Sequence, residues 1–349
     1  MKKTEISLFG AGFTISLVAL FFLVTGQTLA IDWTGEDGLW TNKRGWGKVS
    51  LSPGQASDTN EVVRIVNDAT VTVNADISQG RVATIQVVLT SMLKVEQGAI
   101  LPSASLLVDP HKASGDGSTF EMNGGYWANQ EVITIGRWVD PDGPVNATST
   151  FRMNGGVYTN NNATSRGRVD LGHGDNQGLA LVEFNGGDFW NAGPINLTGG
   201  GNGRSLLHIT GGRFYAGAIL AGAHDDSDGF RAEVRVTGSR ATSIVTDRCE
   251  FYRNEANVNG SSLVKFVPDR SGVTPIRTTL LNLGEGAARG ELEVDLSGYS
   301  NVAGGAIVLF SYETLTGSFG ATNVVAGSQG RNWIVDYRYK GNSIALIRR

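Results

Sequence analysis

The chain has 349 residues, with 48 glycines, 18% charged residues and a formal net charge of −4. This length allows a sizeable core or two domains, and the slightly acidic balance, without a Lys/Arg cluster, argues against nucleic acid as a partner. Glycine is about twice as frequent as its usual share of roughly 7%. Because the glycines recur at fixed turn positions, they indicate a regular architecture and not disorder.

Residues 1–30 are typical of a secretory signal peptide. Lys2 and Lys3 form a basic start, residues 15–24 are apolar, and residues 28–30 (Thr-Leu-Ala) place small side chains at a cleavage position. A retained membrane anchor is the alternative, but the apolar run is short for a span of about 20 residues. We therefore expect a secreted or cell-surface protein with no transmembrane span in the mature chain.

Residues 31–110 are expected to form an N-terminal cap and the first rungs of a repeat. Trp33, Trp40 and Trp46 punctuate a glycine-rich start. Tryptophans at the end of a solenoid more often plug the open core than bind a ligand. Short alternating strands follow, and the one at Leu93 resembles a first, imperfect copy of the repeat that comes next.

A single pattern recurs across residues 111–240, which we expect to be the repeat core. An alternating strand runs into Asn-Gly-Gly or Thr-Gly-Gly, and a degenerate copy follows. In steps of 31, 31, 25 and 27 residues, the Asn or Thr falls at Asn123, Asn154, Asn185, Thr210 and Thr237. Repeats of this length are single supersecondary units that stack on one another. Two clear strands and a polar loop per copy, without a helical period, predict an all-β fold, a right-handed parallel β-helix (β-solenoid).

The strand alternation separates an interior face from an exterior one. One interior column is expected from Phe120, Phe151, Val182 and Leu207. The next residue of each copy points outward and forms a charge column, about 4.8 Å per step, from Glu121, Arg152, Glu183, His208 and Arg235. Opposite charges in such a column support the register of the strands. A ligand-binding role for the column is the alternative.

Two more positions recur as a structural ladder. Asn tolerates left-handed backbone geometry and Gly adopts it at little steric cost, so the Asn-Gly-Gly step predicts a corner of the coil. The asparagines can also hydrogen-bond along the axis; they are Asn123, Asn154 and Asn185. An aromatic residue stands two positions after the second glycine and is expected to stack inside the coil, at Trp127, Tyr158, Phe189 and Phe214.

Neighbouring aromatic residues are less regular, and some are expected to be exposed. They are Tyr126, Trp190 and Tyr215. Exposed rings on a long sheet can pack against the apolar faces of sugar rings. These three residues are therefore the candidates for glycan binding.

Acidic residues could support two other kinds of site. Asp225, Asp226 and Asp228 resemble part of a calcium-binding loop, although the later bidentate Glu is missing. Lyases and hydrolases built on β-helices need clustered acids, whereas Asp140, Asp142, Asp170 and Asp175 are spread over successive copies. We therefore assign no catalytic residue and no cofactor, with calcium as the one candidate.

The single cysteine, Cys249, excludes an intramolecular disulfide, and no histidine has a spacing to it that is typical of a catalytic thiol. Residues 241–349 lose the Gly-Gly pattern but keep strand alternation, which predicts a C-terminal β cap or a small β-sandwich. Its last two strands, 333–339 and 343–347, are expected to form a hairpin.

The sequence combines the tryptophans near the start, the Asn-Gly-Gly and Leu-Gly copies and the motif Leu292-Glu-Val-Asp-Leu-Ser-Gly-Tyr. In these features it resembles bacterial exported β-helix proteins, such as autotransporter-like passengers and PEP-CTERM-type surface proteins. The chain departs from the sorted members, because it ends without a Pro-Glu-Pro signal or an apolar tail. The resemblance implies a structural, matrix or adhesive element that contacts polysaccharide or neighbouring surface proteins, in an oligomeric state that the sequence leaves open. The alternatives are a polysaccharide lyase or glycoside hydrolase on the same scaffold, and a carbohydrate-binding accessory module.

Overall fold

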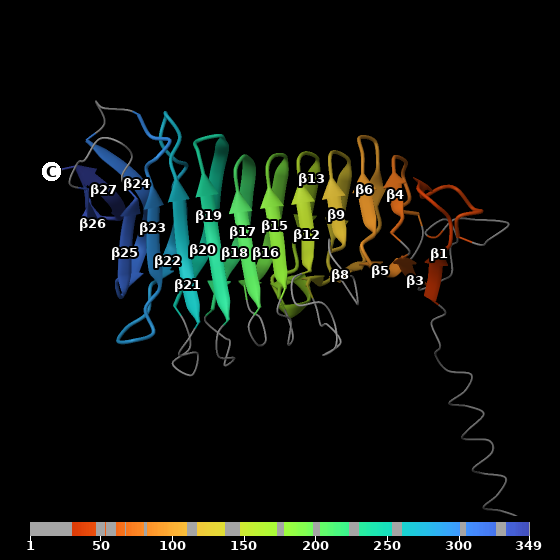
Figure 1. The fold of residues 1–349 in the computed structure, drawn as a ribbon, viewed down its shortest axis with the longest axis horizontal. Helices are drawn as coiled ribbons and strands as arrows, with labels where there is room; N and C mark the ends of the chain where they lie inside the picture. Colours follow the sequence, from red (N-terminus) through yellow and green to blue (C-terminus); the bar gives the residue numbers. More distant parts are fainter. Residues whose placement is uncertain are drawn as a thin grey trace, which may run out of the picture.

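The computed structural model describes residues 30–46, 53, 61–66, 68–79, 82–109, 117–136, 147–172, 178–197, 203–222, 230–252, 260–300, 305–325 and 333–348. These residues form strands and one 3-10 helix, η1 (Ser165–Gly167), without an α-helix. The strands stack as a β-solenoid of about eight turns, which confirms the predicted fold class (Figure 1). No helix among them is long and apolar enough to cross a membrane. The predicted signal peptide lies outside the described residues, apart from Ala30.

The strands form two long sheets that face each other across the core. Sheet B has eleven strands, which pair in this order: β2 (Gly38–Leu39), β4 (Thr70–Val73), β6 (Met92–Val95), β9 (Thr119–Met122), β12 (Thr148–Met153), β15 (Leu179–Phe184), β17 (Arg204–Ile209), β19 (Arg231–Thr237), β21 (Ser261–Val267), β23 (Glu291–Asp295) and β25 (Ala321–Val325). Every neighbouring pair in sheet B is parallel.

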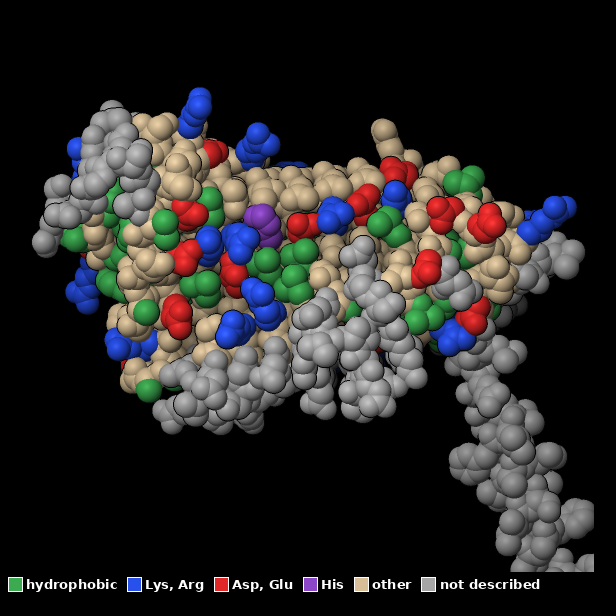
Figure 2. Space-filling view, viewed as in Figure 1, with side chains coloured by type: hydrophobic (Ala, Val, Ile, Leu, Met, Phe, Trp, Pro, Cys, Tyr) green, Lys and Arg blue, Asp and Glu red, His purple; other side chains and the backbone are tan. Residues whose placement is uncertain are grey.

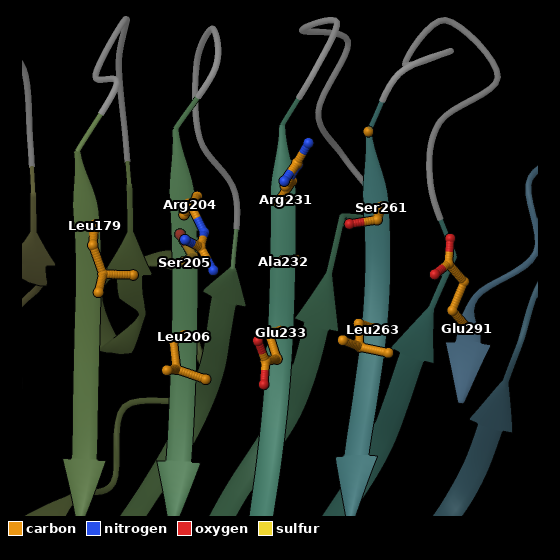
Figure 3. A pocket seen from close by; sticks show the side chains of 11 residues that line it. Leu179, Arg204, Ser205, Leu206, Arg231, Ala232, Glu233, Ser261, Leu263 and Glu291 are labelled. Atoms are coloured by element: carbon orange, nitrogen blue, oxygen red, sulfur yellow. The ribbon is translucent and has the colours of Figure 1, made fainter. Parts of the chain in front are cut away.

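Sheet A has sixteen strands. They are β1 (Ala30–Trp33), β3 (Glu61–Ile65), β5 (Val82–Val88), β7 (Ile100–Leu101), β8 (Ser105–Asp109), β10 (Tyr126–Asn129), β11 (Ile133–Ile135), β13 (Val157–Asn160), β14 (Val169–Leu171), β16 (Asp188–Leu197), β18 (Gly212–Ala221), β20 (Ala241–Phe251), β22 (Ile276–Asn282), β24 (Ala306–Thr316), β26 (Trp333–Tyr339) and β27 (Ser343–Arg348). The solenoid is right-handed. In Figure 1 the near strands of sheet B run upward while successive turns advance from right to left, and Figure 3 shows the same hand.

Each repeat contributes three strand segments, one more than the sequence predicted. In one turn, β12 leads through the Asn-Gly-Gly corner into β13, and η1 then leads into β14. From β16 onward the second and third segments merge into one long strand, which pairs with both β13 and β14. The second segment was missed because its four residues appear in the sequence as isolated aromatic positions.

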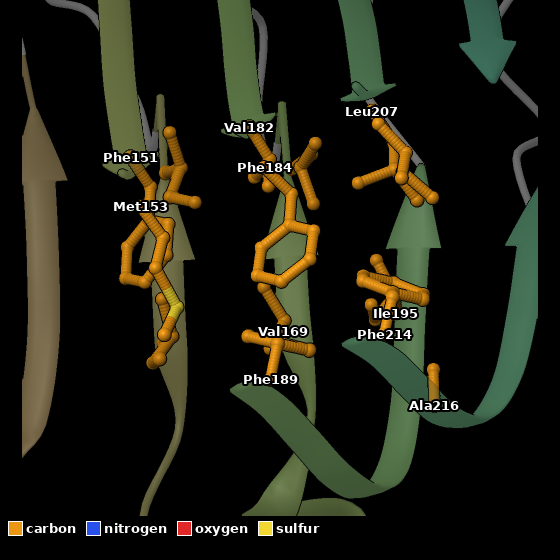
Figure 4. Packing of buried hydrophobic residues seen from close by; sticks show 14 of the residues in the cluster. Phe151, Met153, Val169, Val182, Phe184, Phe189, Ile195, Leu207, Phe214 and Ala216 are labelled. Atoms are coloured by element: carbon orange, nitrogen blue, oxygen red, sulfur yellow. The ribbon is translucent and has the colours of Figure 1, made fainter. Parts of the chain in front are cut away.

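The interior consists of columns of equivalent side chains. Phe120, Phe151, Val182 and Leu207 pair in register and are all buried, as predicted. The second segments add a column of rings in which the successive centroid distances are 5.3, 4.7 and 5.1 Å, formed by Trp127, Tyr158, Phe189 and Phe214. Figure 4 shows these apolar columns meeting between the two sheets. Each side chain packs on the equivalent side chains of the turns before and after it. The hydrophobic core is therefore continuous along the axis of the solenoid.

The corners depend on glycine because successive turns approach too closely for a side chain. The left-handed backbone falls on the second glycine, as at Gly156 (φ +82°), and not on the asparagine. A Cβ added to Gly156 would lie 2.5 Å from the carbonyl oxygen of Gly124 in the preceding turn. The asparagine has a different role, since the Nδ2 of Asn154 donates to the Oδ1 of Asn123 at 2.8 Å and its own Oδ1 accepts from Asn185 at 2.9 Å.

The N-terminal end is closed by the three tryptophans. Trp33, Trp40 and Trp46 are buried, and the rings of Trp33 and Trp40 both meet Trp46 at 4.8 Å. Each indole nitrogen donates to a backbone carbonyl oxygen, at 2.7 to 2.8 Å. This arrangement hides the apolar end of the coil while every buried indole N–H keeps a partner.

At the C-terminal end the coil continues beyond residue 240 before it is capped. The parallel pairing extends to β24 and β25, and β24 then pairs antiparallel with β27, which pairs with β26 in the predicted hairpin. The antiparallel cap therefore belongs to sheet A, and residues 241–349 form no separate sandwich in the described part. The Asn-Gly-Gly motif is absent from this part of the sequence, but the alternation of apolar and polar residues that forms the parallel strands continues.

Candidate functional site

The outer face of the second strand segments carries the exposed aromatic residues. In β10, β16 and β18 alternate residues point inward to the ring column, so the residue beside each buried ring must point outward. Trp190 follows Phe189, and Tyr215 follows Phe214. Among the described residues, Trp190 is the most exposed large apolar side chain, at 47%, and Tyr126 is 42% exposed.

Trp190 and Tyr215 are stacked face to face on this outer surface. They are register partners in β16 and β18, and their ring centroids lie 3.9 Å apart at an interplanar angle of 18°. Each ring restrains the other, so the pair is held in place before any ligand arrives. An apolar ligand face can pack on it with little loss of side-chain freedom.

Charged groups surround this aromatic pair. Arg213 and Asp188 occupy the neighbouring outward positions of the same two strands and form an ion pair. Hydrogen bonding from Arg213 lowers the pKa of Asp188. The hydroxyl of Tyr215 donates to the Oδ2 of Asp247 at 2.9 Å, and burial together with Asp247 raises the pKa of Tyr215. Donors and acceptors for hydroxyl groups therefore lie beside an apolar surface.

Tyr126 lies on the same face, two turns before Trp190. It stands in the column that continues through Val157 to Asp188, and its hydroxyl is 3.4 Å from the Oγ1 of Thr159. Thr159 is the register neighbour of Trp190. The short Thr159 side chain therefore lies between two exposed rings, on a face that brings together all three candidates named from the sequence.

The charge column stands on the outer face of sheet B, where Figure 2 shows red and blue side chains in one row. Arg152 bridges its neighbours, with 2.6 Å to Glu183 and 3.1 Å to Glu121. The column continues through His208 and Arg235, as predicted. Since Arg152 forms ion pairs with both Glu121 and Glu183, this part of the column supports the register of the strands.

We expect the stability of the fold to depend on pH through His208. Burial, followed by the charge of Arg235, lowers the pKa of His208 from 6.5, while Glu183 and Glu233 oppose the shift. Below about pH 6.5 the unfolded chain then binds a proton that the folded chain does not, so stability falls as the pH falls. We expect His208→Gln to reduce the loss in urea midpoint between about pH 7.5 and about pH 5.5. An unchanged difference would show that His208 is not responsible.

The other candidates named from the sequence fall into two groups. Asp140, Asp142, Asp175 and the calcium candidates Asp225, Asp226 and Asp228 lie outside the described residues. Asp170 is described and buried, and it accepts hydrogen bonds from Arg168 at 2.5 Å and Asn196 at 2.7 Å, which gives it a structural role. No group of three or more His, Cys, Asp or Glu side chains in the described part has the arrangement of a metal site. Burial raises the pKa of the Cys249 thiol to about 12, so the thiol stays protonated.

A groove of about 380 Å³ on the outer face of sheet B was not predicted from the sequence. Arg204 and Arg231 stand at one side of it, and Leu206, Glu233 and Leu263 line it below them (Figure 3). Both arginines are three residues before the first apolar position of their copies, Leu207 and Val234. Aligning the copies would have paired them, but the apolar floor arises only when five strands stand side by side.

No known protein family, curated protein or solved structure matches the chain. The function must therefore be inferred from the surfaces that the fold creates.

Proposed function

We propose that this protein is an exported β-solenoid of the bacterial surface, with a structural or adhesive role, that binds glycans through its exposed aromatic face. The observation that carries the proposal is the stacked pair of the exposed Trp190 and the half-buried Tyr215, beside charged groups. A pyranose ring has an apolar face of C–H groups and a rim of hydroxyls. The aromatic pair can pack against the C–H face, and Asp188, Arg213 and Asp247 can hydrogen-bond to the hydroxyl groups of the rim.

The spacing of the rings also suits a sugar chain. Tyr126 and Trp190 are two turns apart, about 9.6 Å along the axis, with Val157 and Thr159 on the outer face of the turn between them. A sugar ring lying over Thr159 would contact both aromatic residues. The stiffness of the solenoid keeps this distance fixed, because the strands beneath are hydrogen-bonded in register.

The test is retention of the purified protein on a panel of neutral and charged polysaccharides. We expect Trp190→Ala and Tyr215→Ala each to weaken binding about tenfold, since each removes a stacking surface. Trp190→Phe, which keeps a ring, should retain most of the affinity. Val325→Ala, at another exposed apolar side chain, is the matched control. If the protein binds none of the polysaccharides, or if both alanine variants bind like the control, the proposal fails.

A lyase or hydrolase is the second candidate, because the sheet B groove gathers Glu233 and Glu291 with two arginines. The two glutamates share one outward column, two turns or about 9.6 Å apart. Inverting glycosidases separate their carboxyl groups by roughly 6.5–9.5 Å. Release of reducing or unsaturated ends by the wild type, but not by Glu291→Gln, would establish this activity.

A further inference from the structure

The sheet B groove presents two positive charges stacked directly on each other. Arg204 in β17 and Arg231 in β19 are register partners, so their backbones are one sheet spacing, about 4.8 Å, apart. Both side chains are exposed. Like charges at directly paired positions destabilise a sheet. The register also pairs two cations at Arg235 and Lys265, in the charge column of the same sheet.

In the charge column, however, Arg235 and Lys265 each have an acidic partner. Lys265 meets Glu293 at 2.6 Å in the next strand, and Arg235 meets Glu233 at 2.6 Å. For Arg204 and Arg231 no acidic partner lies within ion-pair distance among the described residues. Of the two acids that line the groove, Glu233 is already held by Arg235, and Glu291 lies two strands away from Arg231, in β23. The two guanidinium groups are therefore available to an anion.

Beside this charge, the floor of the groove contains two leucines together with Glu233 and Glu291. Leu206 and Leu263 alternate with Glu233 along one column and are half-buried, and Figure 2 shows basic side chains next to apolar ones over β17 and β19. A ligand that fits must carry anionic oxygens on one side and an apolar face on the other. It must also be long, because the groove crosses strands from β15 to β23 along the axis.

We propose that this groove binds an acidic polysaccharide, with the carboxylate or sulfate groups of successive sugars on Arg204 and Arg231. Guanidinium groups bind such oxyanions through paired, charge-assisted hydrogen bonds. The step between the two arginines is comparable with the length of one sugar unit in an extended chain. Bound anions remove the repulsion between the arginines, while the leucines accept the C–H faces of the sugars. This site is separate from the aromatic face and does not rest on the function proposed above.

The test measures binding of the full chain to polygalacturonate, dextran sulfate and neutral dextran at low and at moderate salt. We expect binding to either polyanion or both, weakened by salt, and no binding to dextran in this groove. The two polyanions distinguish carboxylate from sulfate as the preferred group. Arg204→Gln with Arg231→Gln should lower the polyanion affinity about tenfold or more.

Two controls keep this test specific. Arg277→Gln removes an exposed arginine from sheet A and should leave the polyanion affinity unchanged. Val325→Ala, which truncates an exposed side chain of sheet B outside the groove, should also leave it unchanged. Equal losses in Arg277→Gln and the double variant would overturn the proposal, as would the absence of binding to both polyanions. Equal affinity for duplex DNA would overturn the assignment to a polysaccharide.

Discussion

Replacing Gly156 by alanine should destabilise the folded protein by about 3 kcal/mol, the combined effect of a left-handed backbone and a collision with the preceding turn. The φ of Gly156 is +82°, and a Cβ there would lie 2.5 Å from the oxygen and 2.6 Å from the carbon of Gly124. Both atoms belong to the short corner between β9 and β10, and each of these strands is hydrogen-bonded on both sides. The measurement is the free energy of unfolding in guanidinium chloride.

Substitutions at two other glycines separate the cost of the left-handed backbone from the cost of the steric collision. Gly286 has φ +60° but nothing within 4 Å of the place that a Cβ would occupy, so Gly286→Ala should cost only the backbone contribution, about 1 kcal/mol. Gly305 has open space and no left-handed backbone, and Gly305→Ala should be close to neutral. If Gly156→Ala costs no more than Gly286→Ala, the close stacking of turns at this corner is not what requires glycine.

Replacing Phe189 by alanine should cost about 3–5 kcal/mol, because it leaves a gap in the middle of the ring column. Its ring stacks on Tyr158 at 4.7 Å and on Phe214 at 5.1 Å, and it also meets Phe184 at 6.0 Å. In a solenoid each turn depends on its two neighbours, so the gap weakens two interfaces at once. Phe189→Leu, which fills part of the space, should lose less.

The adjacent residue provides the matched control for this substitution. Trp190→Ala removes a larger ring from the outer face of the same strand, and we expect a cost of about 1 kcal/mol from the lost contact with Tyr215. Chemical denaturation of both variants gives the comparison. Similar costs for the two would contradict the assignment of Phe189 to the core and of Trp190 to ligand contact.

The candidate sites differ in how far they could be foreseen. Trp190 and Tyr215 could be named from the sequence because each is next to an interior ring, and alternation places neighbours on opposite faces. Their stacking at 3.9 Å could not be foreseen, since it depends on the register of β16 and β18. The groove with Arg204 and Arg231 was missed for the same reason, because its lining comes from strands that are far apart in the chain.

The periodic part of the structure follows from the order of the amino acids alone. Alternation and the Asn-Gly-Gly corners specify which residues face inward, where the chain turns and which side chains share a column, since these depend on local backbone preferences and on a repeated spacing. The second strand segment of each turn, the continuation of the coil past residue 240 and the side chains that meet on the outer faces became visible only in the folded molecule. Those features arise from contacts between turns some 25 to 31 residues apart, where a shift in loop length or register changes which side chains meet without changing the local pattern.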